Sequence, residues 1–453
     1  MKFFTGMLLI ALLPSAGHAK DVSAPTPPMG WNSYDSYGTY CHEQACFDNL
    51  KTFVEVFKPL GYEYFVIDGG WYIEYETVPG TLLPTADKGY AVNMDKYGRF
   101  ISSKCYFPNG LKSIADECHK HGVKFGVHIL RGIPRKAVAL NTPIKGTEYF
   151  ARDIADTDSI CSWNQHIYGV DMDKPGAQNY YDSWIQSLAD QGIDFIKADD
   201  IVTYPSEIAA VQKAIKKCGR SITLSLSPGG RVLGSEISLY EKADMLRVTG
   251  DVWDRQADID KCFDAWLTWQ YVPVRQGFWL DMGMIPFGEL QVMVPENTKK
   301  KMAGVGTHRF DQFTVSQKES FITMRAMSAS PLMIGGVLPT LDDDSMRLLT
   351  NKEMIACNQN GVMGHLVHNA GYVQIWKTSE CDAQKEAGWI AVFNRGDKPK
   401  TAFIGLEQMG LDAGKKYVLR DVWGKKAFKL GRIMMEPRAC VFVRYEQMDV
   451  SGS

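Results

Sequence analysis

Short apolar runs that are typical of buried strands alternate with stretches of helical periodicity along most of this chain. Eight such runs fall at residues 27–34, 62–68, 123–130, 194–200, 221–227, 245–251, 277–281 and 330–336. This alternation predicts βαβ units and a parallel sheet. A doubly wound sheet would normally begin with a glycine-rich phosphate-binding turn, and none follows the first strand. We therefore expect a (β/α)8 TIM barrel with insertions over residues 20–356.

The rest of the chain has a different sequence pattern, without the alternation of strands and helices. After about Cys357, short β-rich runs are separated by turns rich in Gly, Asp, Lys and Asn, a pattern that favours antiparallel strands. We predict a C-terminal antiparallel β-sandwich domain over residues 357–453. Within the barrel, residues 132–175 show little periodicity. A loop of this length is usually functional, and we place it at the substrate entrance.

The first 19 residues have the features of a secretory signal peptide. Met1-Lys2 gives a basic start, Met7 to Leu13 an apolar run, and Gly17-His18-Ala19 a small-residue end. No later stretch approaches the length of apolar sequence that spans a bilayer. We expect the mature protein to be secreted or periplasmic, without a membrane span.

The charge and cysteine patterns argue against a nucleic-acid-binding protein and against a metal site with cysteine ligands. The formal net charge is -2, and no Lys/Arg cluster stands out, which argues against a nucleic-acid partner. The 10 cysteines show no metal-like spacing. Cys41 and Cys46 could form a local bridge, although free buried thiols are an equal alternative.

The run from Asp194 to Asp200 ends in Lys-Ala-Asp-Asp, which places charged side chains at the C-terminal end of a predicted strand. Lys197 and Asp199 share one face of that strand, so the lysine would keep the acid ionised, as a nucleophile requires. A structural ion pair is the alternative. Asp251 ends another predicted strand, on the face that carries Arg247 and Thr249. It could be a second catalytic acid, a helix cap or a partner of Arg247.

Two carboxylates at strand tips, without a redox or phosphate motif, suggest glycoside hydrolysis. In that case Lys197 would lower the pKa of Asp199, while Asp251 would need a raised pKa. Further polar residues at predicted strand tips are Asp68, His128, Ser227 and Asp281. Aromatic residues fall near predicted loops, where they would either stack on sugar rings or belong to the core: Tyr34, Trp71, Trp163, Trp253 and Trp279.

Six motifs in chain order resemble glycoside hydrolase family 27, which holds α-galactosidases, α-N-acetylgalactosaminidases and β-L-arabinopyranosidases. They are Pro-Pro-Met-Gly-Trp-Asn-Ser (27–33), Val-Ile-Asp-x-x-Trp (66–71), Phe-Gly-Val-His (125–128), Phe-Ile-Lys-x-Asp (195–199), Arg-x-x-x-Asp (247–251) and Ser-Pro-Leu-Met-Ile-Gly-Gly (330–336). Residues 419–424 also resemble the family's C-terminal domain.

The resemblance implies a retaining mechanism, with Asp199 as nucleophile and Asp251 as general acid and then base. It implies a substrate-binding set as well: Asp68, Trp31, Tyr34, His128, Lys197, Ser227, Arg247 and Asp281. Retention would require the two carboxyl groups to stand roughly 5 to 5.5 Å apart. No metal or organic cofactor is implied.

Several residues at predicted sugar-binding positions differ from those that the family usually carries. Gly69 follows Asp68 where the family usually has a second acid that grips the galactose O4 and O6 hydroxyls. The other departures are Tyr34 for Trp, His128 for Tyr, Gly283-Met284 for Asp-Met, and Ser227 for Glu, the last as in the N-acetylgalactosaminidases. Missing hydroxyl partners can change sugar specificity by orders of magnitude.

We expect a retaining exo-glycosidase that acts on a carbohydrate, with α-galactosidase as the first reading. The alternatives are α-N-acetylgalactosaminidase, favoured by Ser227, Gly229 and Gly230, and β-L-arabinopyranosidase, favoured by Gly69 because that sugar has no C6 hydroxyl. A non-catalytic carbohydrate-binding barrel would predict loss of Asp199 or Asp251, and both are present. The linkage, the aglycone and the oligomeric state stay open.

Overall fold

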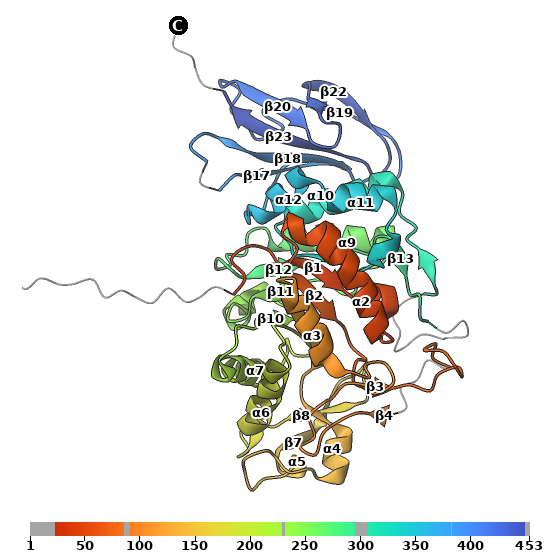
Figure 1. Ribbon diagram of the computed structural model, residues 1–453. Coiled ribbons are helices and arrows are strands. Elements are labelled where there is room, and N and C mark those ends of the chain that lie inside the picture. Colours follow the sequence, from red (N-terminus) through yellow and green to blue (C-terminus); the bar gives the residue numbers. More distant parts are fainter. Residues whose placement is uncertain (1–22, 86–90, 229–231, 295–305, 382, 449–453) are drawn as a thin grey trace, which may run out of the picture.

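A computed structural model describes residues 23–85, 91–228, 232–294, 306–381 and 383–448. Eight parallel strands form one sheet in the order β12-β11-β10-β9-β5-β2-β1-β15 (Figure 1). Their bounds are β1 (Met29–Asn32), β2 (Tyr64–Ile67), β5 (Lys124–Leu130), β9 (Phe195–Asp199), β10 (Thr223–Leu226), β11 (Met245–Arg247), β12 (Trp279–Asp281) and β15 (Leu332–Ile334). The predicted signal peptide lies outside the described residues.

The sheet closes on itself just beyond β12. Ile285 forms a parallel bridge to Ile334. Its N–H donates to the carbonyl of Met333 at 2.8 Å, and its own carbonyl accepts from the N–H of Gly335 at 2.9 Å. The predicted TIM barrel is therefore confirmed.

Helices cover the outside of the barrel because their apolar residues recur at helical spacing. The helices of eight or more residues are α2 (Glu43–Thr52), α3 (Gly110–Lys120), α6 (Ala177–Asp190), α7 (Pro205–Cys218), α9 (Gln256–Trp269), α10 (Val315–Met327) and α12 (Lys352–Gln359). Shorter helices are α1 (Tyr34–Tyr37), α4 (Arg135–Leu140), α5 (Ala151–Ile154), α8 (Ile237–Tyr240) and α11 (Asp343–Leu349). The α10 capping box is made by Thr314 and Gln317.

The close approach of β1 to β2 depends on a glycine. A Cβ on Gly30 would lie 2.2 Å from the backbone oxygen of Tyr64. Strand alternation then turns Trp31 toward the helices and Asn32 toward the barrel interior. Side chains of β1 are thus divided between the core and the site.

Two predicted features differ from the structure. β11 ends at Arg247, so Thr249 and Asp251 lie in the following loop and not on the strand. The 132–175 insertion is not an irregular loop: it contains α4, α5 and a small sheet of β6 (Ile133–Pro134), β8 (Ile167–Val170) and β7 (Ala155–Ile160). The polar, partly exposed β7 has no hydrophobic alternation, which is why the sequence did not reveal the sheet.

The C-terminal strands form two antiparallel layers at the end of the molecule opposite the insertion (Figure 1). One sheet has the order β16-β17-β18-β23-β20-β21 and the other is the pair β19-β22. The bounds are β16 (His365–Ala370), β17 (Val373–Ser379), β18 (Ala387–Asn394), β19 (Lys400–Ile404), β20 (Tyr417–Asp421), β21 (Lys426–Ala427), β22 (Gly431–Met435) and β23 (Cys440–Gln447). The predicted β-sandwich is present, but the expected boundary after residue 356 falls inside α12.

Two further small strand pairs are β3 (Ile73–Glu74) with β4 (Ala91–Val92), and β13 (Glu289–Leu290) with β14 (Arg309–Phe310). The π-helix η1 (Phe53–Phe57) and the 3₁₀ helices η2 (Lys58–Leu60), η3 (Gly234–Glu236) and η4 (Leu338–Thr340) are the other short elements. Cys41 and Cys46 are buried free thiols whose sulfur atoms lie 3.5 Å apart. Over the described part of the chain, no helix combines the length and the apolar character needed to cross a membrane.

Candidate active site

Asp199 is the last residue of β9 and points into the mouth of the barrel. Its Oδ2 accepts a hydrogen bond from His128 Nε2 at 3.1 Å and lies 4.0 Å from Lys197 Nζ. Its Oδ1 is buried and has no hydrogen-bond partner among the described residues. One oxygen is therefore fixed by the protein, while the other is free to react.

The surroundings of Asp199 keep it ionised. Burial alone would raise its pKa, but the charge of Lys197 and the hydrogen bond from His128 outweigh burial and hold the pKa well below its usual range. For Lys197 the directions are reversed. Burial by itself would lower the pKa of Lys197, but the negative charges of Asp68 and Asp199 outweigh burial and raise that pKa. The predicted effect of Lys197 on the acid is thus present in the structure.

Asp68 follows β2 and anchors the lysine. Its Oδ2 accepts hydrogen bonds from Lys197 Nζ and from Asn32 Nδ2, both at 2.8 Å. The N–H of Asp68 donates to Ser33 Oγ at 2.9 Å. Sequence reasoning gave no role to Asn32 or Ser33, although both lie in the Pro-Pro-Met-Gly-Trp-Asn-Ser motif, which was the available signal.

Asp251 occupies a different environment. Its Oδ1 accepts from Arg247 Nη2 at 2.8 Å, and its side chain is 49% exposed, against 13% for Asp199. Burial would lower the pKa of Arg247, but Asp251 and Asp199 raise it. One carboxylate is thus enclosed beside a lysine, and the other stands at the mouth of the barrel.

Several polar atoms around these carboxylates are buried without a hydrogen-bond partner in the described structure: His128 Nδ1, Ser227 Oγ, Arg247 Nε and Thr249 Oγ1. Buried polar groups are normally paired, so this set is suited to a ligand with several hydroxyl groups. Beneath it, Asn32, Lys197, Arg247 and Asp281 contribute to the lining of a cavity of about 20 Å³, which is room for about one water molecule.

Comparison with known proteins decides the family. The glycoside hydrolase family 27 β-L-arabinopyranosidase of Geobacillus stearothermophilus is 36% identical, with a TM-score of 0.84, over 95% of this chain and 98% of its own. This chain belongs to glycoside hydrolase family 27. A Bacillus halodurans protein described as a candidate α-N-acetylgalactosaminidase is 33% identical, with a TM-score of 0.79, over 93% of this chain and 97% of its own.

The family also includes curated α-galactosidases that resemble this chain. That of Cyamopsis tetragonoloba is 23% identical over 88% of this chain and 80% of its own length. No family model matches the chain. The protein is a glycoside hydrolase with α-galactosidase relatives, and the prediction from its motifs is confirmed.

Gly69 follows Asp68 at the place where the resemblance to the family predicts a second acid. A Cβ on Gly69 would lie 3.4 Å from the Nδ1 and Cε1 atoms of His128. The imidazole therefore packs against the space into which a longer side chain at residue 69 would extend. The two departures at residues 69 and 128 are thus neighbours in space.

The remaining predicted binding residues differ in their surroundings. Tyr34 is half-buried, with Lys197 Nζ 5.9 Å from its ring centre. Asp281 is the buried last residue of β12, and its Oδ1 accepts from the N–H of Gly283 at 2.9 Å. Trp31 does not reach the site: its indole donates to the carbonyl of Gly336 and packs in the core. Gly229 and Gly230 lie outside the described residues.

Proposed function

We propose that this family 27 enzyme is a retaining exo-glycosidase in which Asp199 is the nucleophile and Asp251 is the acid/base residue. The supporting observation is the asymmetry of the Asp199 carboxylate. His128 and Lys197 stabilise Oδ2 as an anion, while Oδ1 is buried and free. A nucleophile needs this combination, whereas a structural carboxylate would use both oxygens.

The reaction then has two steps. Asp199 Oδ1 forms a bond to the anomeric carbon, the bond to the leaving oxygen breaks, and Asp251 gives that oxygen a proton. In the second step Asp251 takes a proton from water, whose oxygen attacks the anomeric carbon and releases Asp199. Two inversions give overall retention. Arg247, which pairs with Asp251, keeps the acid/base residue at the mouth of the barrel.

For the terminal sugar, we propose a pyranose of the galacto configuration, with β-L-arabinopyranosides preferred over α-D-galactosides. The two sugars share their ring stereochemistry, and arabinopyranose lacks the C6 hydroxymethyl group. Gly69 offers no carboxylate to bind a C6 hydroxyl, and His128 packs beside it. A variant of the Geobacillus arabinopyranosidase was crystallised with arabinose, and this relative covers nearly the whole chain.

α-Galactosidase activity is the second candidate. The chain has the lysine and acid contacts around Asp68, and its curated relatives are α-galactosidases. An α-galactoside would place its C6 hydroxyl where this chain has no acid to bind it. We expect a larger KM for that sugar than for the arabinopyranoside.

The test is hydrolysis of p-nitrophenyl β-L-arabinopyranoside, α-galactoside and α-N-acetylgalactosaminide. Wild type should hydrolyse the arabinopyranoside best, and Asp199→Asn should lower turnover by about 10³-fold or more. Asp190→Asn, an exposed change on α6, is the matched control. Proton NMR should show the product in the anomeric form of the substrate. Inversion, or full activity of Asp199→Asn, would refute the mechanism.

We also propose that the protein is exported after cleavage following Ala19. The proposal depends on the basic start, the apolar run and the small-residue end of residues 1–19. N-terminal sequencing of the protein from the extracellular or periplasmic fraction should begin at Lys20. Recovery of the intact chain in the cytoplasm would contradict export.

A further inference from the structure

Trp163 lies in the short loop between β7 and β8 of the 132–175 insertion, and its side chain is 46% exposed. The other tryptophans of the chain are buried or half-buried. Nothing in the proposed reaction uses this residue. An exposed indole combines a large apolar face with a polar N–H, which makes it a frequent contact in recognition sites.

The insertion that carries Trp163 is clamped to the nucleophile strand. Arg131 is fully buried just before the insertion, and its N–H donates to the carbonyl of Asp199 at 3.1 Å. Its Nε donates to the carbonyl of Asp200 at 2.8 Å, and its Nη1 to Glu207 Oε1 at 2.9 Å. The N–H of Gly132 donates to the Tyr181 hydroxyl at 2.7 Å. The base of the insertion therefore has a fixed position relative to Asp199.

The loop itself is held against the same strand tip. The Cys161 thiol lies near the carboxylate of Asp200, the residue after the nucleophile, and the charge of this carboxylate adds to burial in raising the pKa of the thiol. The backbone N–H groups of Trp163 and Asn164 lie near the Cys161 sulfur and favour its ionised form. Asn164 Oδ1 accepts from the N–H of His166 at 2.8 Å. Cys161 and Asn164 are buried, whereas Trp163 between them is exposed. The indole is thus exposed to solvent on a loop whose neighbouring Cys161 lies near Asp200, the residue after the nucleophile.

The insertion follows the C-terminal end of β5, and Asp199 stands at the same end of the barrel as the last residue of β9. The terminal sugar must occupy the enclosed space around Asp199, so the rest of an exo-acting enzyme's substrate extends past Asp251 into solvent. Loops that follow the C-terminal ends of barrel strands border that opening. A pyranose presents an apolar face of C–H groups, and an aromatic side chain can bury such a face at low entropic cost.

We propose that Trp163 is the binding platform for the leaving group and stacks on the sugar ring attached to the terminal residue. The inference rests on the proposed exo-glycosidase function and adds a subsite for a glycosidic leaving group. In this proposal the insertion contributes to specificity for the leaving group. Asp68, Gly69 and His128 determine specificity for the terminal sugar.

The test compares two substrates that carry the same terminal sugar. A glycosyl fluoride has no ring in its leaving group, whereas a disaccharide does. Trp163→Ala should lower kcat/KM for the disaccharide by about 10-fold and leave the fluoride unchanged. Trp163→Phe should restore most of the disaccharide activity. The sugar of both substrates is the one, arabinopyranose or galactose, whose fluoride wild type hydrolyses faster.

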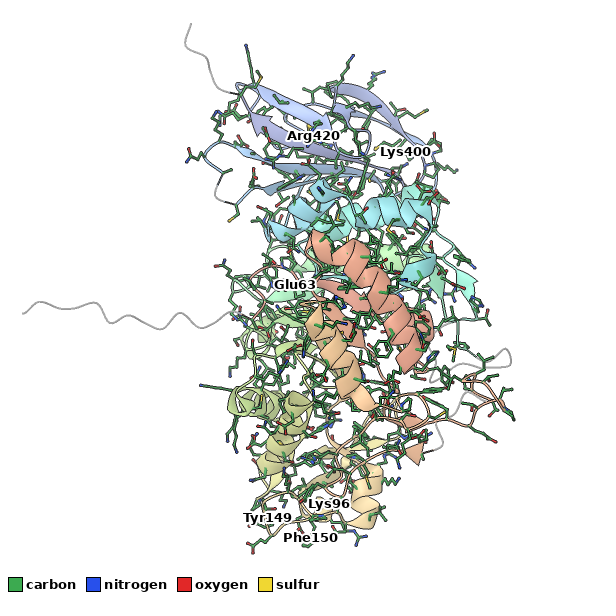
Figure 2. All side chains as sticks on the ribbon, viewed as in Figure 1. Glu63, Lys96, Tyr149, Phe150, Lys400 and Arg420 are labelled. Atoms are coloured by element: carbon green, nitrogen blue, oxygen red, sulfur yellow. The ribbon has the colours of Figure 1, made fainter. Side chains whose placement is uncertain are left out.

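Phe150→Ala is the matched control, because Phe150 is an exposed aromatic residue (43% exposed) of the same insertion. Figure 2 shows it at the tip of the molecule, far from the barrel. Equal losses on both substrates would mean a structural role for Trp163, and no loss on either would mean no contact; both would overturn the proposal. If wild type hydrolyses neither fluoride, the proposed function itself fails.

Discussion

Asp199 and Lys197 show how two residues of one strand face produce a reactive carboxylate. Burial and the lysine act on the pKa of Asp199 in opposite directions, and the lysine, with help from His128, prevails. The lowered pKa also affects folding: the Asp199 contribution to stability is present above about pH 4 and is lost as the pH falls toward the folded-state pKa.

Removal of the lysine should move the acid side of the pH profile. In Lys197→Met, burial is no longer offset, so the pKa of Asp199 rises and the carboxylate is protonated at a higher pH. We expect the acid limb of kcat/KM to shift to higher pH, together with a lower maximal rate. Lys217→Met, which removes an exposed lysine, is the control. An unshifted acid limb would show that Lys197 does not set the ionisation of the nucleophile.

Gly69 and His128 should act as a pair in sugar choice. Gly69→Ala should be nearly neutral, because its Cβ would make an ordinary 3.4 Å contact with the imidazole. Gly69→Asp alone should impair turnover of both sugars, since its carboxylate must share space with His128. Gly69→Asp with His128→Tyr introduces the acid and the tyrosine that the family resemblance predicts at these positions, and should shift kcat/KM toward the α-galactoside by about 10-fold. Additive effects of the two changes would contradict the pairing.

At the scale of elements, the barrel depends on close backbone approach between β1 and β2. Gly30 leaves no room for a side chain beside Tyr64. That contact also places Asn32 next to Asp68, so the register of two strands determines part of the site.

Gly30→Ala should therefore destabilise the barrel. We expect a loss of about 1–3 kcal/mol in the free energy of unfolding, measured by urea unfolding with tryptophan fluorescence. Gly250→Ala is the comparison, because no atom lies within 4 Å of its added Cβ. Equal stability of the two variants would mean that β1 can move away from β2 without cost.

At the scale of the whole molecule, the main feature is the interface between the barrel and the β-sandwich. Trp266 of α9 stacks on Trp376 of β17 with ring centres 3.7 Å apart, and its indole donates to the carbonyl of Gly364 at 2.9 Å. Trp376 belongs to the same apolar core as the barrel helices. The two domains thus bury a shared aromatic contact.

Trp376→Ala should weaken this interface. We expect a loss of about 3–5 kcal/mol, and calorimetry should resolve a separate, lower transition for the β-sandwich. Phe403→Ala, at a side chain that is 62% exposed on β19, should change stability by less than about 0.5 kcal/mol. A single unshifted transition in Trp376→Ala would show that the domains are coupled elsewhere.

The sequence by itself determined the alternation of strands and helices and the run of short β-strands that follows the barrel. It also determined that Lys197 and Asp199 lie on one face of a strand. These are local patterns, because strand and helix periodicity and two-residue spacing depend only on neighbours in the chain. The small sheet in the insertion escaped this reasoning because β7 is polar and its partners lie in other segments.

Only the tertiary structure decided which residues meet. It placed Trp31 in the core and brought Asn32 to Asp68 across 36 residues of sequence. It also brought His128 against Gly69 and Cys161 against Asp200. The Asn32–Asp68 and His128–Gly69 contacts join neighbouring strands of a closed barrel, and their distances follow from strand register and barrel closure, which no local pattern encodes.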